Sequence, residues 1–318
     1  LDVIEVNFPG KGTLVTPTFG KPTGLRFFIL LRSLGIFAAC LSKATDGRMP
    51  ADHETIRIWG LHGGKTADDF FLFREVLGGG GPGRPWADGS DVVHIVPNSR
   101  NLPAEFSEQR YPVRVEKLGL ATDSGGAGFH RGGFGYDKRI RLLEDARLLS
   151  NADRALLNTY GVNGGKAGET FGIEIDHKTG ESESVPGMAD NINVSLDSVI
   201  RIVTTGGGGW GDPLRRDVDA VCYDVECGLV TTGSAKSDYG VVLESEESGY
   251  KYKVNVTETQ KLRDAMRKSR GEVPMFDRGD YFRKVAAIKG IDWPDGWDDP
   301  DQGWKAVVGI EEDEAANI

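Results

Sequence analysis

One stretch of the chain combines the residue types that can bind an anion. DSGGAGFHRGGFG, Asp123–Gly135, places an acid and a hydroxyl before two glycines and an arginine before two more. Consecutive backbone N–H groups can converge on a negative charge, and a guanidinium binds a carboxylate or a phosphate through two parallel hydrogen bonds. A tight hairpin in which Asp123 caps its own loop explains the same residues without any ligand. Both interpretations stay open from the residues alone.

A second glycine-rich stretch, TTGGGGWGDP at Thr204–Pro213, contains the spacing G-x-G-x-x-G. In dinucleotide-binding proteins this spacing follows a strand and opens a helix whose N-terminus holds a phosphate. The preceding VIRIVTT is a good strand and a helix can begin at Pro213, but no confident strand follows, and Asp224 matches the ribose-binding acid only loosely. We therefore predict a close-approach turn with Trp210 packed beside it, and not a Rossmann site.

Two other candidate sites have weaker support. The five histidines are scattered without the spacing of a metal-ligand set, so we predict no metal site in this chain. In PNSRNLPAEFSEQRYP, Glu105 and Glu108 share a face, as a general acid–base pair needs, only if the segment is helical. Its prolines favour an extended path with one turn, which is typical of a solvated or subunit-contact loop.

The composition of the 318 residues argues against several classes of protein. The net charge is -10 and no basic patch is present, which argues against nucleic-acid binding. Three cysteines without a C-x-x-C pair favour a reducing cytoplasm, and we expect Cys222 and Cys227 to be buried free thiols. The apolar segment Leu25–Leu41 carries Arg32 in its middle, and the uncharged run after Arg32 is too short to span a bilayer, so we expect a core helix.

Strands dominate the expected secondary structure after residue 90. Short runs rich in valine, isoleucine and tyrosine end at turn residues and do not alternate with helices as a parallel sheet requires. Val256–Gly271 is the clearest helix, with Thr257 and Gln260 as a capping box, whereas ADDFFLFREVL at residues 67–77 is helix-ambiguous. The expected strands are DVVHIVP, YPVRVEKL, DKRIRLL, TFGIEID, NVSLDSVIRIVTT and YGVVL.

Several segments, taken together and in order, resemble the carboxyl-terminal half of the hydantoinase B/oxoprolinase family. The resemblance extends from Val3 to Gly271 and implies an α+β fold, a strand-rich mixed body with a few helices and no Rossmann domain. Residues 1–271 would form the family-like region, and residues 272–318 an acidic extension that contains tryptophan. The segments that carry the resemblance are FPGKGTLVTP, NLPAEFSEQRYP, DSGGAGFHRGGFG, DRALLNTYGVNGGKAG, GGGGWGDPLRRDVDAVCYDVECGLVT and SDYGVV.

The resemblance implies the C-terminal portion of a B-type subunit in an ATP-dependent hydrolase of cyclic amides such as hydantoin or 5-oxoproline. An A-type partner would bind ATP and Mg and phosphorylate the substrate oxygen, and the B-type subunit would complete the reaction. A divalent metal would belong to the N-terminal half of the B-type subunit, which is missing from this chain. The expected partners are the A-type subunit, that missing half and a small-molecule substrate in the cytoplasm, without nucleic acid or membrane. The isolated chain is expected to be inactive.

Under this resemblance the stretch Asp123–Gly135 would border a substrate or phosphate channel. The candidate catalytic residues are Arg131, as an anion contact, and Asp123 and Ser124, as orienting groups. The candidate substrate- or phosphate-binding residues are Gly125, Gly126, His130 and Gly132.

Two alternatives remain open. The helix QKLRDAMRKSRG and the acidic tail with tryptophans look somewhat more like the ketone carboxylase branch of the family, whose members carboxylate acetone or acetophenone. Alternatively, the chain is a non-catalytic assembly module, in which the glycine loops are interface turns and Trp293, Trp297 and Trp304 are anchors.

Overall fold

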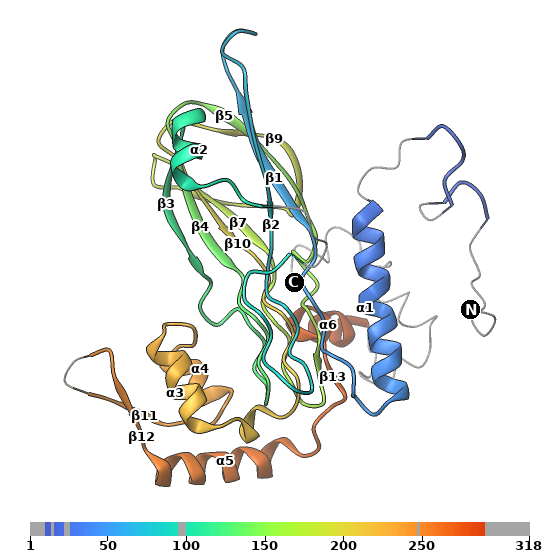
Figure 1. Cartoon of the computed structure of the whole chain (residues 1–318), viewed down its shortest axis with the longest axis vertical. Helices are drawn as coiled ribbons and strands as arrows, with labels where there is room; N and C mark the ends of the chain where they lie inside the picture. Colours follow the sequence, from blue (N-terminus) through green and yellow to red (C-terminus); the bar gives the residue numbers. More distant parts are fainter. Residues whose placement is uncertain (1–9, 14–15, 22–25, 95–99, 247–248, 290–318) are drawn as a thin grey trace.

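Two antiparallel sheets lie face to face and form a β-sandwich, the upper part of the molecule in Figure 1. The structure is a computed structural model and describes residues 10–13, 16–21, 26–94, 100–246 and 249–289. The first sheet has the order β2-β1-β5-β9, built from β1 (Arg57–Gly63), β2 (Phe71–Leu77), β5 (Ala146–Ala152) and β9 (Met188–Val194). The second has the order β3-β4-β10-β7-β8, built from β3 (Val113–Leu120), β4 (Tyr136–Leu142), β7 (Gly172–Asp176), β8 (Ser182–Val185) and β10 (Val199–Val203).

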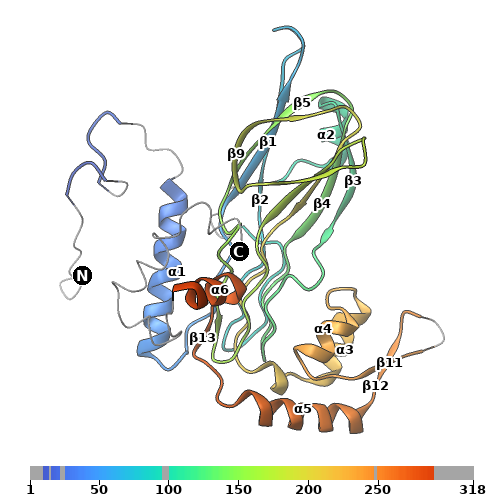
Figure 2. The same cartoon turned by 180° about the vertical axis from the view of Figure 1, so that it is seen from behind.

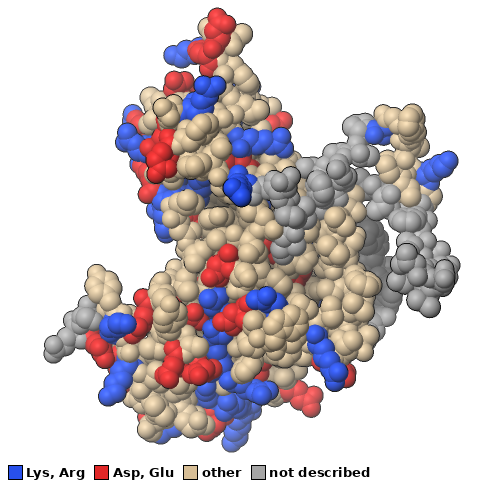
Figure 3. Space-filling model, in the orientation of Figure 1, with Lys and Arg blue, Asp and Glu red and all other residues tan. Residues whose placement is uncertain are grey.

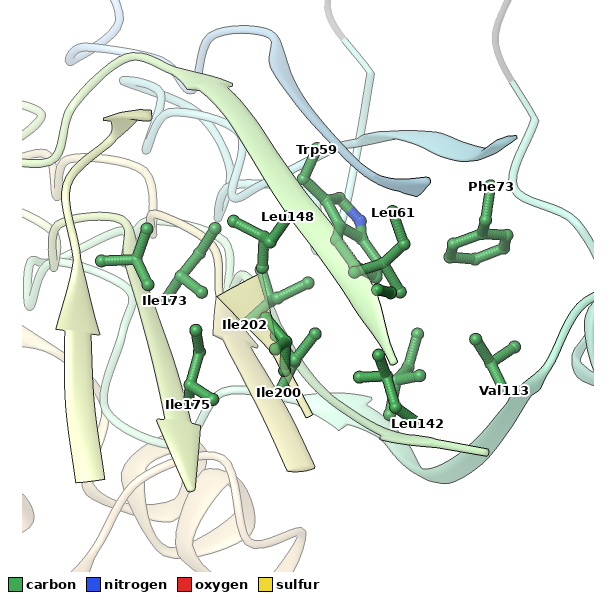
Figure 4. Close-up of a cluster of buried hydrophobic side chains, with 14 of the residues drawn as sticks. Trp59, Leu61, Phe73, Val113, Leu142, Leu148, Ile173, Ile175, Ile200 and Ile202 are labelled. Carbon is green, nitrogen blue, oxygen red and sulfur yellow. The ribbon is translucent and has the colours of Figure 1, made fainter. Parts of the chain in front are cut away.

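The sandwich has an apolar core because alternate side chains of each strand point inward. On β10, Ile200 and Ile202 are 0% exposed, and they meet Trp59 and Phe73 from the opposite sheet within one buried cluster (Figure 4). An ion pair lies in the same buried space, where Lys138 Nζ of β4 is 2.6 Å from a carboxylate oxygen of Glu75 on β2. The pairings between strands are antiparallel, which confirms the α+β fold and the absence of a Rossmann sheet among the described residues.

Below the sheets, glycine-rich segments run side by side (Figures 1 and 2). We call them the glycine bundle; they comprise residues 78–83, 124–127, 132–133, 159–168 and 206–209. Hydrogen bonds between backbones connect them: Gly207 N–H donates to the Gly133 carbonyl at 2.9 Å, and Gly209 N–H donates to the Lys166 carbonyl at 2.9 Å. The N–H groups of Gly207 and Gly209, both in the segment 206–209, therefore donate to different neighbouring segments, as in extended chains with about three residues per turn.

The bundle is too tight for side chains. A Cβ atom on Gly206 would lie 1.7 Å from the Ser124 carbonyl oxygen, and one on Gly208 would lie 1.9 Å from the Tyr160 carbonyl oxygen. The predicted close approach at residues 206–209 is therefore confirmed, but the predicted turn is wrong at these residues. They form an extended segment, and the chain turns only at Gly211, where φ is 74°. Trp210 packs beside the bundle as predicted, and its indole Nε1–H donates to the Gly47 carbonyl at 2.8 Å.

The helices lie around the sandwich and the bundle. In Figure 1, α1 stands to the right of the body with α6 beside α1, α3 and α4 lie at the lower left beside the bundle, and α5 runs beneath it. The apolar sides of α3 and α4 share a second buried cluster with Ala127 and Phe134, so this lower layer packs against the bundle. The bounds are α1 (Arg26–Ala44), α2 (Ala104–Arg110), η1 (Pro213–Arg215), α3 (Val218–Glu226), α4 (Thr232–Ser237), α5 (Val256–Arg270) and α6 (Gly279–Lys289).

Two small antiparallel ladders complete the described elements. One joins β11 (Leu243–Ser245) to β12 (Tyr252–Val254). The other joins β6 (Gly161–Val162), within the bundle, to β13 (Phe276–Asp277). Part of the predicted extension after residue 271 thus pairs with the bundle, and the predicted boundary at 271/272 stays a prediction. The three tail tryptophans lie outside the described residues.

Both expected helices are present, but the capping residue of one and the burial of the other differ from the prediction. The helix near residue 256 is present, but Asn255 caps it by accepting from Glu258 N–H at 3.0 Å, in place of the predicted Thr257 box. The helix at Arg26–Ala44 is present, but it is not a core helix, because much of its surface is exposed. No helix in the described ranges is long and apolar enough to cross a membrane. The segment Ala104–Arg110, expected to be extended with one turn, is helical.

Four of the expected strands correspond to β3, β4, β7 and β10. The predicted strand that contains β10 also includes the end of β9, and a turn separates the two. DVVHIVP is not a strand in its described residues 91–94, and YGVVL contributes only Leu243 to β11. The ambiguous residues 71–77 are the strand β2. The cysteine prediction is half right: all three thiols are free, but Cys227 is exposed and Cys222 is only partly covered.

Candidate functional site

The predicted anion-binding stretch runs between the lower layer and the glycine bundle. Asp123, which begins it, has a φ of 61° and joins the stretch to the residues that follow α3. Its N–H donates to the Leu229 carbonyl at 2.9 Å, and its carboxylate accepts from the Thr231 N–H at 2.8 Å. The Asp123 side chain therefore ties two segments together, as a capping acid does.

Ser124 and Gly126 are buried inside the bundle, and Gly125 between them is partly buried. The Ser124 hydroxyl donates to the Ala121 carbonyl at 2.7 Å and accepts from the Gly135 N–H at 3.0 Å. Gly126 N–H donates to the Gly207 carbonyl at 2.9 Å, and Gly132 N–H donates to the Gly126 carbonyl at 2.9 Å. These N–H groups are used within the bundle and do not converge on an open position.

Arg131 lies in a cluster of charged side chains beside the bundle. Its Nε is 3.3 Å from Asp224, and its Nη1 is 3.2 Å from Asp91. Arg216 binds Asp88 through two parallel hydrogen bonds of 2.7 Å and reaches Asp224 at 3.0 Å. We call this group the charged cluster; it consists of Asp88, Asp91, Arg131, Arg216 and Asp224.

The arginines of the charged cluster influence the pKa of one of its acids, Asp88. Burial by itself would raise the pKa of the Asp88 carboxyl, but the hydrogen bonds and charge of Arg216, together with Arg131, lower it below its ordinary value. Burial raises the pKa of the nearby Tyr239 hydroxyl, although the charge of Arg216 opposes the shift. At neutral pH Asp88 is therefore ionised, and the Tyr239 phenol is neutral.

His130, another predicted site residue, lies next to the charged cluster and is more exposed than Arg131. Its imidazole is 21% exposed, and its Nδ1 is 3.6 Å from an Asp88 oxygen. The ring makes an edge contact with Phe129 at 4.7 Å between centroids, and the His130 backbone pairs with Trp210 through hydrogen bonds of 2.8 and 2.9 Å. His130 is thus held rigidly at the surface with an acid beside it.

The structure brings some predicted residues together and leaves others apart. Arg131 belongs to the charged cluster and His130 lies next to it, whereas Ser124 and the glycines lie inside the bundle. Glu105 and Glu108 do lie on a helix, but this helix is α2, at the end of the sandwich away from the bundle (Figure 1). Among the described residues, no group of three histidine, cysteine or acidic side chains could hold a metal ion.

Sequence reasoning missed the acids of the charged cluster. Asp88 and Asp91 follow the glycine run 78–83 in GRPWADGSD, and Arg216 and Asp224 follow the second run. Charged residues in the segments that follow the glycine runs were the available signal, since the runs had to pack together. Asp224 was considered only as a ribose-binding acid, and its actual partners are Arg131 and Arg216.

Comparison with known proteins matches residues 1–213 to the family Hydantoinase B/oxoprolinase. The putative D-/L-hydantoinase B-type subunit of Pseudomonas sp. (strain NS671) is 29% identical over 243 residues, which are 76% of this chain and 41% of that relative. The solved ATP-dependent caprolactamase from Pseudomonas jessenii superposes with a TM-score of 0.59 at 25% identity, over 70% of this chain and 40% of that chain.

A nucleotide-free acetone carboxylase structure superposes with a TM-score of 0.63 over 89% of this chain and 43% of that chain. Its sequence identity is 18%, so this likeness shows a shared fold alone. The chain spans about two fifths of the length of each of these proteins, at 41%, 40% and 43%.

Proposed function

Because the chain belongs to the Hydantoinase B/oxoprolinase family, we propose that it is part of the B-type subunit of an ATP-dependent hydrolase of cyclic amides. The observation that carries the proposal is the family match over residues 1–213 together with a relative named as the B-type subunit of a hydantoinase. The caprolactamase supports the same substrate class, because hydantoin, 5-oxoproline and caprolactam all contain an amide within a ring. The proposed partner is an A-type subunit that binds ATP and Mg, and the proposed location is the cytoplasm.

The chemistry explains why such an enzyme needs a partner that consumes ATP. Resonance stabilises the amide carbon against attack by water. Transfer of the γ-phosphoryl group of ATP to the amide oxygen releases ADP and a proton and converts the amide into a reactive O-phosphorylated imidate. Water then adds at its carbon, and the ring nitrogen leaves as an amine, which gives an acyl phosphate. A second water hydrolyses the acyl phosphate to the carboxylate and inorganic phosphate. The divalent metal that the family resemblance places in the other half of the subunit has no three-ligand group among the described residues.

Within this function we keep the predicted site as a proposal. Arg131, Asp123 and Ser124 are the proposed catalytic residues, and a phosphoryl oxygen would replace a cluster carboxylate at the Arg131 guanidinium. The proposed contacts with substrate or phosphate also include His130, whose imidazole is partly exposed beside Asp88. Gly125, Gly126 and Gly132 complete the proposed set as the residues that follow Ser124 and Arg131 in the chain.

Reconstitution tests the function. The chain, the rest of the same B-type polypeptide and an A-type subunit encoded beside it are purified and mixed with ATP and hydantoin, 5-oxoproline or caprolactam. We expect ADP release coupled to ring opening, and none when the chain is omitted. ADP release that requires bicarbonate and acetone or acetophenone, without any lactam turnover, would assign the chain to a ketone carboxylase instead. Full turnover without this chain would leave only the assembly role.

A matched pair of variants tests the site. His130 and His177 are both 21% exposed and both lie beside a carboxylate, but His177 is on the β7–β8 hairpin, away from the bundle. In the reconstituted enzyme, His130→Gln should lower kcat/KM by about tenfold or more, which is about 1.4 kcal/mol, while His177→Gln stays within about twofold. Arg131→Lys should lower it similarly, because an ammonium cannot replace a planar fork. Unchanged turnover in His130→Gln and Arg131→Lys, with intact folds, would remove the site proposal.

A further inference from the structure

Helix α1 exposes several large apolar side chains. Its sequence, RFFILLRSLGIFAACLSKA, is apolar on most sides, and an all-round apolar helix is normally buried. In the structure four of its large apolar side chains stay open to solvent: Leu30 (48%), Leu34 (46%), Ile36 (61%) and Phe37 (60%). In Figure 3, the part of the surface near α1 that grey residues leave uncovered is mostly tan, without a large charged patch.

The position of α1 on the body is well defined. One stripe of α1 faces the body, with Leu31 at 1% and Ala39 at 5% exposure. The Tyr160 hydroxyl donates to the Gly35 carbonyl at 2.7 Å, and Arg32 on α1 pairs with Asp153 at 2.6 Å. Because these contacts fix the orientation of the helix, the open side chains face outward in a constant arrangement.

We propose that the outward face of α1, Leu30, Leu34, Ile36 and Phe37, is a docking surface for the rest of the B-type polypeptide. This inference rests on the proposed function, in which the chain is one portion of a longer subunit. Its support is the length of the relatives, since the chain spans 41% of the hydantoinase subunit and 40% of the caprolactamase chain. The remaining residues of such a subunit must pack somewhere, and a fixed apolar face is where burial gains most.

The cysteines provide a direct probe of this surface. Cys40 is exposed on α1, one turn beyond Ile36 and Phe37, while Cys227 is exposed at the C-terminal end of α3, in the lower layer. In a Cys222→Ser background, each thiol is labelled with a maleimide and the two rates are read separately by mass spectrometry. Adding the rest of the same B-type polypeptide should slow Cys40 labelling by about tenfold or more and leave the Cys227 rate unchanged.

Two variants test whether the apolar side chains form the contact. Phe37 and Phe70 are 60% and 59% exposed, and Phe70 lies at the outer end of the β1–β2 hairpin. Phe37→Gln should abolish most of the Cys40 protection, and Phe70→Gln should keep it. Equal Cys40 rates with and without the added polypeptide would overturn the inference. Protection that instead rises with the concentration of the chain alone would also overturn it and assign the face to a second copy.

This experiment uses neither ATP nor an A-type subunit, so it is independent of turnover. Cys40 protection without any lactam hydrolysis would keep the docking surface and reject the proposed activity. Hydrolysis without Cys40 protection would keep the activity and reject the docking surface.

Discussion

The β-sandwich and the glycine bundle exclude water in opposite ways. In the sandwich, branched and aromatic side chains fill the space between two sheets, as Ile200 and Trp59 do at 0% exposure. In the bundle, backbones touch directly, and a Cβ on Gly207 would lie 1.9 Å from the Gly81 carbonyl oxygen. Side-chain packing tolerates small changes of volume because rotamers adjust, whereas two backbones joined by hydrogen bonds have no rotamers to move. The two regions should therefore respond very differently to the loss or gain of one carbon atom.

The largest effect is expected from adding a methyl group to the bundle. Gly206→Ala places a Cβ 1.7 Å from the Ser124 carbonyl, so one of the two segments has to move and lose its hydrogen bonds. We expect destabilisation of more than about 3 kcal/mol, or failure to fold. Thermal unfolding followed by circular dichroism measures it, with Gly172→Ala as the control. Gly172 lies in β7 with nothing within 4 Å of the added atom, and alanine there should be neutral or favourable. Similar melting temperatures for the two variants would contradict the contrast.

The next largest effect is expected at the ion pair inside the sandwich. Lys138→Met leaves the Glu75 carboxylate, whose side chain is 1% exposed, without its partner. Removing one partner of a buried pair typically costs about 3–5 kcal/mol. Urea unfolding followed by the fluorescence of the tryptophans, of which Trp59 is buried in this sandwich, measures the change. The double variant Glu75→Leu/Lys138→Met should recover most of the loss, and an unrecovered loss would mean that steric fit, not charge, is responsible.

Removing one methyl group from the sandwich core should have a smaller effect. Ile200→Val leaves a small cavity between the sheets and should cost about 0.5–1.5 kcal/mol in the same urea experiment. The free-energy losses of Ile200→Val and Gly206→Ala compare the two regions most directly, because each variant changes one carbon atom at a buried position. A cost for Ile200→Val that equals the cost of Gly206→Ala would show that both regions are equally rigid.

The smallest effect is expected from acid at the charged cluster. The pKa of Asp88 is lower in the folded protein than its ordinary value, so the folded protein binds a proton here less readily than the unfolded chain. The stabilisation is therefore complete above the unfolded pKa near 3.9 and is lost as the pH falls through the folded pKa. Because the Asp88 side chain is 35% exposed, solvent weakens the effect. Melting temperatures between pH 7 and pH 3 should fall less steeply in Asp88→Asn than in the unmodified chain.

The sequence predicted the regular parts of the fold better than the bundle. Strands such as DKRIRLL and TFGIEID alternate apolar and polar residues, and this local pattern is enough to place them. β5, ARLLSNA, contains residues that are common in helices, and its pairing with β1 and β9, distant in sequence, makes it a strand. The glycine runs correctly predicted segments without regular secondary structure. Their packing into one bundle was not predictable, because it depends on contacts between segments far apart in the chain.

The candidate site was predictable only in part for the same reason. Arg131 and His130 stand out because they interrupt glycines, and the structure places them together beside the bundle. Their carboxylate partners come from residues 88–91 and 224, more than 30 positions away in sequence. No local spacing rule links such positions, so the charged cluster becomes visible only when the glycine segments are assembled.

The glycine bundle also has a consequence for the heat capacity of unfolding. Exposing apolar side chains to water raises the heat capacity, while exposing peptide groups lowers it. Unfolding of the sandwich therefore contributes as in ordinary proteins, but unfolding of the bundle releases mainly N–H and carbonyl groups. With 44 glycines in 318 residues, the chain should show a heat-capacity increment per residue below the usual value of about 12–15 cal/mol/K. Its stability curve should accordingly be flatter with temperature than that of a sandwich of equal length.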